Sequence, residues 1–212
     1  IAQPIANILT VFITPISNLL SPITTELDVR NEHNVLKKVL AMILNAGSFF
    51  LLPCLVILVV YSYEIIELLF GLRYVNASIT LKFSAIYMFF VIMNEFIYSF
   101  INGFGLPKQK MKAMYIAALL NLVLSLILIP LFGTVGAVVA GLISNVFIFT
   151  AGLYLLEKKS IFTLSVLKNY SALLFSLAVF IAVHYSMIHL LSIDNIFMRI
   201  AVNTFTAGTV YL

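Results

Sequence analysis

Three apolar runs, separated by turns of only a few residues, constrain the fold of this chain more than any other feature. They cover about residues 78–104, 111–132 and 135–156. A helix of about 20 residues spans the ~30 Å hydrocarbon core of a bilayer. Because lipid cannot pair with backbone polar groups, a spanning segment must be a helix or a strand of a closed barrel. The runs lack the two-residue alternation of barrel strands, so they predict transmembrane helices.

The composition of the chain excludes several classes of protein. Of its 212 residues, 63% are hydrophobic and 9% are charged, whereas a soluble domain has about 25% charged residues. The basic residues lie near the ends of apolar runs rather than in a patch with interleaved aromatic residues, so we expect no nucleic-acid partner. The sequence contains no nucleotide-binding loop, catalytic triad or metal-ligand cluster. We therefore expect neither an enzyme nor a bound metal or cofactor.

Seven apolar segments occur along the chain, and they predict an all-α integral membrane protein with a single helical lobe over residues 1–212. The chain starts without a Met and stops inside an apolar run, so we expect a fragment whose first and last segments are truncated. Residues 65–70 are apolar except for Glu67 but too few to span a bilayer, and we expect a short interfacial helix at about 64–70. Besides the three runs above, the segments cover about 5–24, 39–61, 170–191 and 196 onward.

The basic residues are distributed unevenly between the two sides of the predicted membrane domain. Nine of the twelve Lys and Arg residues lie in the loops that follow the first, third and fifth segments. Cytoplasmic loops carry an excess of Lys and Arg, so we expect these loops in the cytoplasm of a multi-pass protein of the cell membrane. The nine are Arg30, Lys37, Lys38, Lys108, Lys110, Lys112, Lys158, Lys159 and Lys168, and the opposite side holds Arg73, Lys82 and Arg199.

A single carboxylate, Glu95, lies inside the third segment, and its neighbours at helical spacing form a polar stripe. An ionised carboxylate in the membrane costs about 2.5–3.5 kcal/mol on insertion scales, so such a residue normally has a use. One interpretation is that Glu95 contacts a substrate or a coupling proton or Na⁺ in a central cavity. The other is that a hydrogen-bonded Glu95 holds two helices together. The stripe consists of Ser84, Tyr87, Val91, Glu95, Tyr98, Ser99 and Asn102.

Other polar residues near or within the apolar segments allow both functional and structural interpretations. Arg73 and Lys82, near the outer end of the third segment, could bind an anionic headgroup such as a pyrophosphate or extend to the membrane surface. Asn121 and Asn145 are interpreted as hydrogen-bonding residues between helices. Small residues between 133 and 144 predict close helix packing.

Several motifs, in order, resemble one family of membrane carriers. Glu67–Tyr74 with Lys82, Asn102–Lys108 and Asn121–Ala137 are similar to helix junctions in the C-terminal lobe of polysaccharide (O-antigen-type) flippases. These flippases are lipid-linked oligosaccharide transporters of the multidrug/oligosaccharidyl-lipid/polysaccharide exporter superfamily. The resemblance covers most of residues 10–156 and is weaker beyond them.

The resemblance implies one lobe of a two-lobe carrier that works by alternating access around a central cavity. The implied function is movement of a lipid-linked oligosaccharide from the cytoplasmic to the outer leaflet, and the implied partners are the lipid bilayer, the saccharide and a missing N-terminal lobe of the same protein. Such cavities often carry basic residues, whereas Glu95 is acidic and favours ion or proton coupling. A cation-coupled multidrug exporter and a non-transporting membrane scaffold remain as alternatives.

Overall fold

Helices make up nearly all of the part of the chain that the computed structural model describes, residues 2–159. This part contains no β-strand, and the expected all-α architecture is confirmed. The long helices follow the apolar segments closely because few charged residues interrupt the segments. In order, the elements are α1 (Ala2–Val29), α2 (His33–Val60), α3 (Ser62–Phe70), the 3₁₀ helix η1 (Leu72–Tyr74), α4 (Ala77–Gly103), α5 (Pro107–Phe132) and α6 (Thr134–Lys158).

Four of the described helices, α2, α4, α5 and α6, are long and apolar enough to cross a membrane. They correspond to the second to fifth predicted segments. The first predicted segment lies within α1, which contains Pro15 and Pro22. The sixth and seventh predicted segments lie outside the described residues, so a count of seven spans and a two-lobe arrangement stay predictions.

The short helix expected at about 64–70 is present as the nine-residue helix α3. It ends at Gly71, whose φ of +84° is one that residues with a side chain rarely adopt. Leu68, Leu69 and Phe70 in its last turn are exposed. An exposed apolar turn next to the first residues of a spanning helix is what the predicted interfacial position requires.

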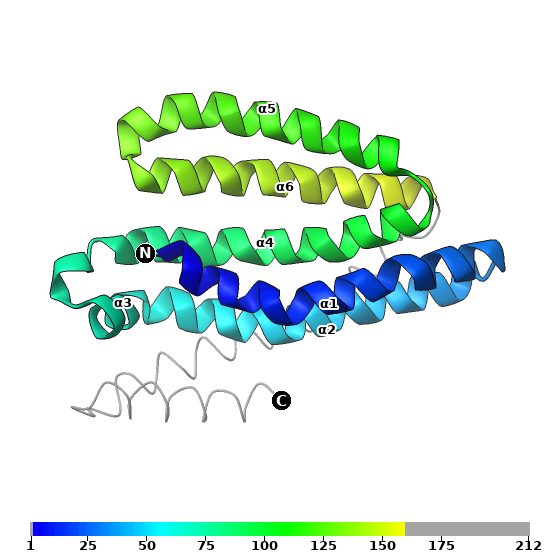
Figure 1. The fold of residues 1–212 in the computed structure, drawn as a ribbon, viewed down its shortest axis with the longest axis horizontal. Helices are drawn as coiled ribbons and strands as arrows, with labels where there is room; N and C mark the ends of the chain where they lie inside the picture. The colour runs from blue at the N-terminus through cyan, green and yellow to red at the C-terminus, as the bar shows by residue number, and fades with distance from the viewer. Residues whose placement is uncertain (1, 160–212) are drawn as a thin grey trace.

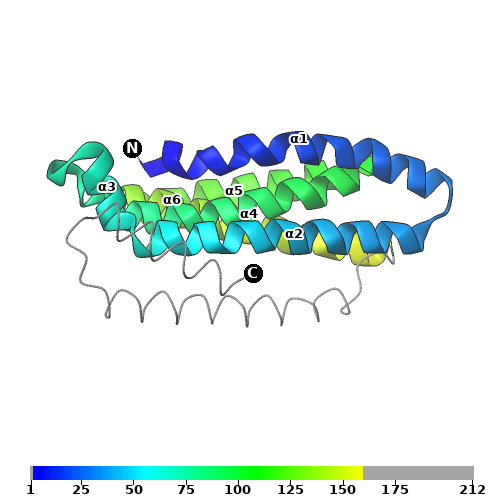
Figure 2. The ribbon, with the colours of Figure 1, turned by 90° about the horizontal axis from the view of Figure 1, so that it is seen from below.

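Helix α4 lies at the centre of the described bundle. It packs against α1, α2 and α6, whereas α5 packs mainly along α6, and Figures 1 and 2 agree on this arrangement. In the most apolar stretch of each helix, 67% of the residues of α4 are buried, against 6% of those of α5. The helix that follows α4 in sequence is therefore not its main neighbour, and this separation shapes the candidate site.

Small residues let two other helices approach α4 closely. A Cβ atom added at Gly103 would lie 2.5 Å from Cβ of Thr24 in α1, and one added at Gly47 in α2 would lie 2.7 Å from the ring of Phe96. The hydroxyl of Thr25 donates a hydrogen bond to the Gly103 carbonyl at 2.9 Å. These contacts fix α1 and α2 on one side of α4.

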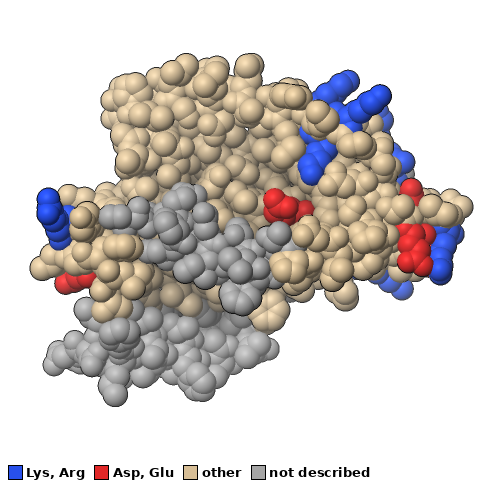
Figure 3. Space-filling view, viewed as in Figure 1, with Lys and Arg blue, Asp and Glu red and all other residues tan. Residues whose placement is uncertain are grey.

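The three connections rich in basic residues lie at one end of the bundle. The α1–α2 loop, the α4–α5 turn and the end of α6 are together in Figure 1, and Figure 3 shows most of the visible Lys and Arg at that same end. The grouping fits the predicted charge asymmetry. Assignment of this end to the cytoplasm stays a prediction of the charge rule.

Helices α5 and α6 form a tight hairpin whose turn depends on glycine. Gly133 has a φ of +59°. A Cβ atom added at Gly136 would lie 2.1 Å from the carbonyl oxygen of Leu128, a backbone atom that cannot rotate away. The first turn of α6 therefore touches the backbone of α5 directly.

Replacing Gly136 by Ala should force α5 and α6 apart at this turn. Overpacking of a tight contact costs about 1–3 kcal/mol, so we expect the full-length protein in detergent to show a lower thermal unfolding midpoint. Ala137→Ser adds one atom at the neighbouring exposed position and should leave the midpoint near that of the wild type. Equal midpoints for Gly136→Ala and Ala137→Ser would show that the hairpin is not held by this contact.

Candidate functional site

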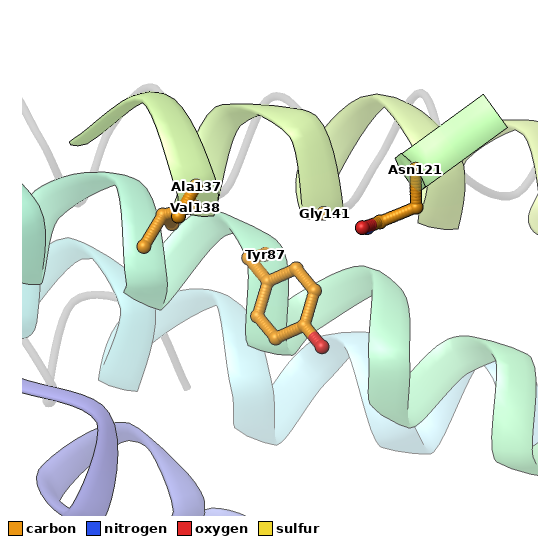
Figure 4. Close-up of a pocket in the computed structure, with 5 residues that line it drawn as sticks. All are labelled: Tyr87, Asn121, Ala137, Val138 and Gly141. Carbon is orange, nitrogen blue, oxygen red and sulfur yellow. The ribbon is translucent and has the colours of Figure 1, made fainter. Parts of the chain in front are cut away.

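A groove with polar residues along its floor follows α6, with α5 on one side and α4 on the other at its two ends, and we refer to it as the polar groove. Three adjoining hollows of about 100, 440 and 220 Å³ make up the groove. The first and second share Asn145 and Ile148 of α6, and the second and third share Asn121 of α5. In Figure 4, which shows the third, Tyr87 of α4 and Asn121 lie on either side of Gly141 of α6.

The floor of the groove is fixed by hydrogen bonds between α4 and α6. The side-chain amide of Asn94 donates to the backbone oxygen and to Oδ1 of Asn145, at 3.0 and 3.2 Å. The hydroxyl of Tyr98 donates to the backbone oxygen of Ile148 at 3.0 Å. The paired residues are 51 and 50 positions apart, and this near-constant offset shows that α4 and α6 run parallel.

Two glycines of α6 bring its backbone close to α4 along this floor. A Cβ atom added at Gly152 would lie 2.6 Å from Cγ2 of Ile97, and one added at Gly141 would lie 3.1 Å from the ring of Tyr87. Close approach of this kind is typical of small residues at transmembrane interfaces. The small-residue pattern predicted close packing, and the structure shows that α4 and α5 are the neighbours.

Glu95 lies on the wall of the smallest hollow, which is also lined by Asn94, Tyr98 and Lys110. Its side chain is exposed on the surface of the described bundle, although α4 is the most buried spanning helix. Figure 3 shows acidic surface on this face between the two charged ends. Glu95 therefore faces an open groove at the depth of the membrane and is not enclosed between two helices.

Lys110 is the cationic residue of this hollow, and it comes from the opposite wall. It is the fourth residue of α5, in the first turn of the helix, and it is half-buried. Its ammonium nitrogen lies 6.0 Å from the centroid of the Tyr98 ring, within the range of a cation–π interaction. The hollow thus contains a carboxylate, an ammonium group, an aromatic face and two amide side chains.

The predicted polar stripe divides among different surroundings. Glu95 and Tyr98 share the smallest hollow. Tyr87 lines the hollow of about 220 Å³ at the other end of the groove, near the α5–α6 turn. Ser84 is fully buried, the hydroxyl of Ser99 donates to the backbone oxygen of Ser17 in α1, and Asn102 is exposed near the end of α4. The stripe follows α4 but does not form one continuous surface, because different helices cover different parts of it.

Arg73 and Lys82 lie away from the groove. Arg73 is in η1 and Lys82 is in the second turn of α4, both exposed, beyond the residues that line the three hollows. This position suits contact with headgroups at the membrane surface. Neither residue is placed to meet a ligand near Glu95.

Asn94 and Lys110 are site residues that the sequence argument missed. Asn94 lies one position, or about 100° of helix rotation, from Glu95 and so fell outside the stripe. Lys110 was expected in the loop after the third segment, because the fourth segment was expected to begin at about residue 111, whereas α5 begins at Pro107. The neighbouring polar pair Asn94-Glu95 inside an apolar segment was the available signal. Asn145 was expected to join helices, and its bond with Asn94 does so.

Within the described part of the chain, His, Cys, Asp and Glu form no group of three or more that could hold a metal ion. The chemistry available in the groove is hydrogen bonding, charge and contact with aromatic rings. These are the means of binding a polar solute.

Loss of the Asn94 amide should weaken the α4–α6 interface. Hydrogen bonds between transmembrane helices contribute about 0.6 kcal/mol on average, and Asn94 donates two. We expect Asn94→Leu to lower the free energy of unfolding of the full-length protein by about 1 kcal/mol, measured by denaturant titration in mixed micelles. Tyr98→Phe, which loses one bond and keeps the ring, should show about half of that effect.

Asn121→Leu is the matched control, because Asn121 accepts its bond from Ser125 on the same helix, at 3.2 Å. It should leave the α4–α6 interface intact. If Asn94→Leu and Asn121→Leu prove equally mild, the floor of the groove is held by packing and not by these polar contacts.

Comparison with known proteins supports the assignment to the membrane. No family model matches the chain. It is 27% identical over 139 residues, 66% of its length, to an uncharacterized membrane protein of Methanocaldococcus jannaschii. The chain spans only 27% of the length of that relative. With four described helices long and apolar enough to cross a bilayer, this similarity identifies the chain as a membrane protein.

Proposed function

We propose that the chain forms one lobe of a carrier that moves a lipid-linked oligosaccharide from the cytoplasmic to the outer leaflet of the cell membrane. The observation that carries the proposal is the polar groove on the surface of the spanning helices. Lipid would leave the carboxylate of Glu95, and Oδ1 of Asn94, which has no hydrogen-bond partner among the described residues, without partners. A polar occupant, water or solute, is needed to satisfy them.

The shape of the groove suits a solute with a polar head and a lipid tail. Its hollows follow one another from Lys110, near the end rich in basic residues, to Tyr87 and Ala137, near the opposite end. The groove opens on one face of the bundle, because α5 packs on α6 and leaves α4 partly uncovered. A saccharide head could therefore lie in the groove while its lipid tail stays in the bilayer.

The motifs that resemble the flippase family border this groove. Residues 102–108 form the α4–α5 turn, with Pro107 as the first residue of α5. Residues 121–137 contribute Asn121, the α5–α6 turn and Ala137. We propose that a second lobe of the whole protein supplies the opposite wall, and that rocking of the two lobes exposes the groove to each side in turn. The greater length of the relative leaves room for such a lobe.

A cation-coupled drug exporter is the second candidate, and Glu95 favours it. A carboxylate in the groove would repel the phosphates of a lipid-linked saccharide and attract a cation. The groove supports either solute, because its amide side chains donate and accept hydrogen bonds without regard to charge. A transport assay separates the two candidates.

Replacing Glu95 by Gln should impair transport without disturbing the fold. We expect the full-length wild type to restore surface polysaccharide in a cell that lacks its own flippase. Glu95→Gln should lower that restoration by about tenfold, the effect of losing ~1.4 kcal/mol. Glu67→Gln in α3, outside the groove, is the matched control and should restore as the wild type does.

The other results each select a different conclusion. Drug resistance without surface polysaccharide would favour the exporter. Absence of both activities from the wild type, at normal abundance in the membrane, would favour a scaffold. Normal restoration by Glu95→Gln would reduce Glu95 to a structural residue.

A further inference from the structure

Two acceptor groups in the smallest hollow of the groove have no hydrogen-bond donor or cationic partner among the residues that the structure describes. Asn94 is only 7% exposed, and its Oδ1 is buried without a hydrogen-bond partner, although its amide nitrogen is used. The adjacent Glu95 forms no ion pair with any residue in the described part of the chain. A buried acceptor without a partner costs about 1–3 kcal/mol, and a donor that reached Oδ1 of Asn94 would recover this cost.

The ring of Tyr98 is a third group in this hollow that attracts a cation. Its hydroxyl is held by the backbone oxygen of Ile148 at 3.0 Å, so the orientation of the ring is fixed. The face of an aromatic ring carries negative potential and attracts cations. A carboxylate, an amide oxygen and an aromatic face are together the groups that recognise an ammonium ion.

The protein's own Lys110 shows that the hollow accepts such an ion. Its ammonium nitrogen lies 6.0 Å from the Tyr98 ring centroid, and it belongs to the hollow that Glu95 and Asn94 line. Lys110 does not reach Glu95, since no ion pair within 4.0 Å joins them. The lysine therefore occupies the aromatic part of the hollow and leaves the two oxygen acceptors unused.

The hollow has room for a second ammonium group once Lys110 withdraws. Its volume is about 100 Å³, and a water molecule in the liquid occupies about 30 Å³. Lysine has a long flexible stem, and Lys110 belongs to α5, which has few contacts with α4. Displacement of this side chain requires no change in the α4–α6 floor.

We propose that Asn94, Glu95 and Tyr98 form a binding site for a primary ammonium group, and that Lys110 is an internal competitor that occupies part of the site when no ligand is bound. The ligand is an amine-bearing solute, an amino sugar or the headgroup of an ethanolamine lipid. The site does not depend on the flippase proposal, because it concerns binding alone.

The competitor role of Lys110 gives the proposal its sharpest test. Full-length protein in phosphatidylcholine nanodiscs is titrated with octylammonium chloride, and binding is measured by calorimetry. Lys110→Met removes the competitor and should tighten binding by about tenfold, whereas Glu95→Gln should weaken it by about tenfold or more. Lys112→Met, at the exposed position two residues on, is the matched control and should bind as the wild type does.

Opposite results would overturn the proposal. It fails if Lys110→Met binds octylammonium no more tightly than the wild type, or if octanol binds as well as octylammonium. It also fails if Glu95→Gln, shown to be folded by its unfolding midpoint, keeps full affinity. None of these results touches the surface-polysaccharide assay, so the two proposals can fail separately.

Two further arms identify the source of the ammonium group. Glucosamine should compete with octylammonium if an amino sugar is the ligand, and N-acetylglucosamine, which lacks the charge, should not. Nanodiscs made with phosphatidylethanolamine should lower the apparent affinity for octylammonium if a lipid headgroup is the ligand. If neither glucosamine nor phosphatidylethanolamine competes, the natural ligand is a different amine. The effects of Lys110→Met and Glu95→Gln on octylammonium binding then decide whether the proposed site exists.

Discussion

The pairing of polar groups in a place without water is the constraint on which the rest of this structure depends. Three polar side chains of helix α4 donate hydrogen bonds to the backbones of other helices. Asn94 and Tyr98 reach α6, and Ser99 reaches α1. Each bond requires its partner helix to lie at a particular side and depth of α4. The central position of α4 follows from these polar groups as much as from apolar packing.

A consequence is that α5 is excluded from most of the surface of α4. Helices α1, α2 and α6 already cover α4, and glycines in α6 let it approach more closely than α5 can. The α5–α6 hairpin is tight because Gly136 contacts the α5 backbone, so α5 follows α6. The polar groove is the space left between α5 and α4. The groove exists because α5 packs on α6 and not on α4, and neither α4 nor α5 has to be interrupted to form it.

The sequence allowed the helices to be predicted but not their neighbours. The lengths of the apolar runs and the short turns between them placed α4, α5 and α6 within a few residues, because span length is a local property. The choice of α6 over α5 as the partner of α4 depends on contacts between residues about fifty positions apart, such as Asn94 with Asn145. Lys110 joins the site only because that choice sets α5 across the groove. A usable signal was present: α4 is the least apolar of the four spanning helices and the most buried.

The polar groups that α4 contributes to the groove differ in how completely they are paired, and this difference separates stability from binding. On the floor, the amide nitrogen of Asn94 and the hydroxyl of Tyr98 are both bonded to α6. In contrast, Oδ1 of Asn94 and the carboxylate of Glu95 have no partner in the described chain. The side-chain nitrogen of Asn94 is therefore bonded to α6, whereas the oxygen of the same amide has no partner. A cation that pairs with the exposed carboxylate of Glu95 would leave the α4–α6 bonds intact, so occupancy of the groove can change while its floor stays the same.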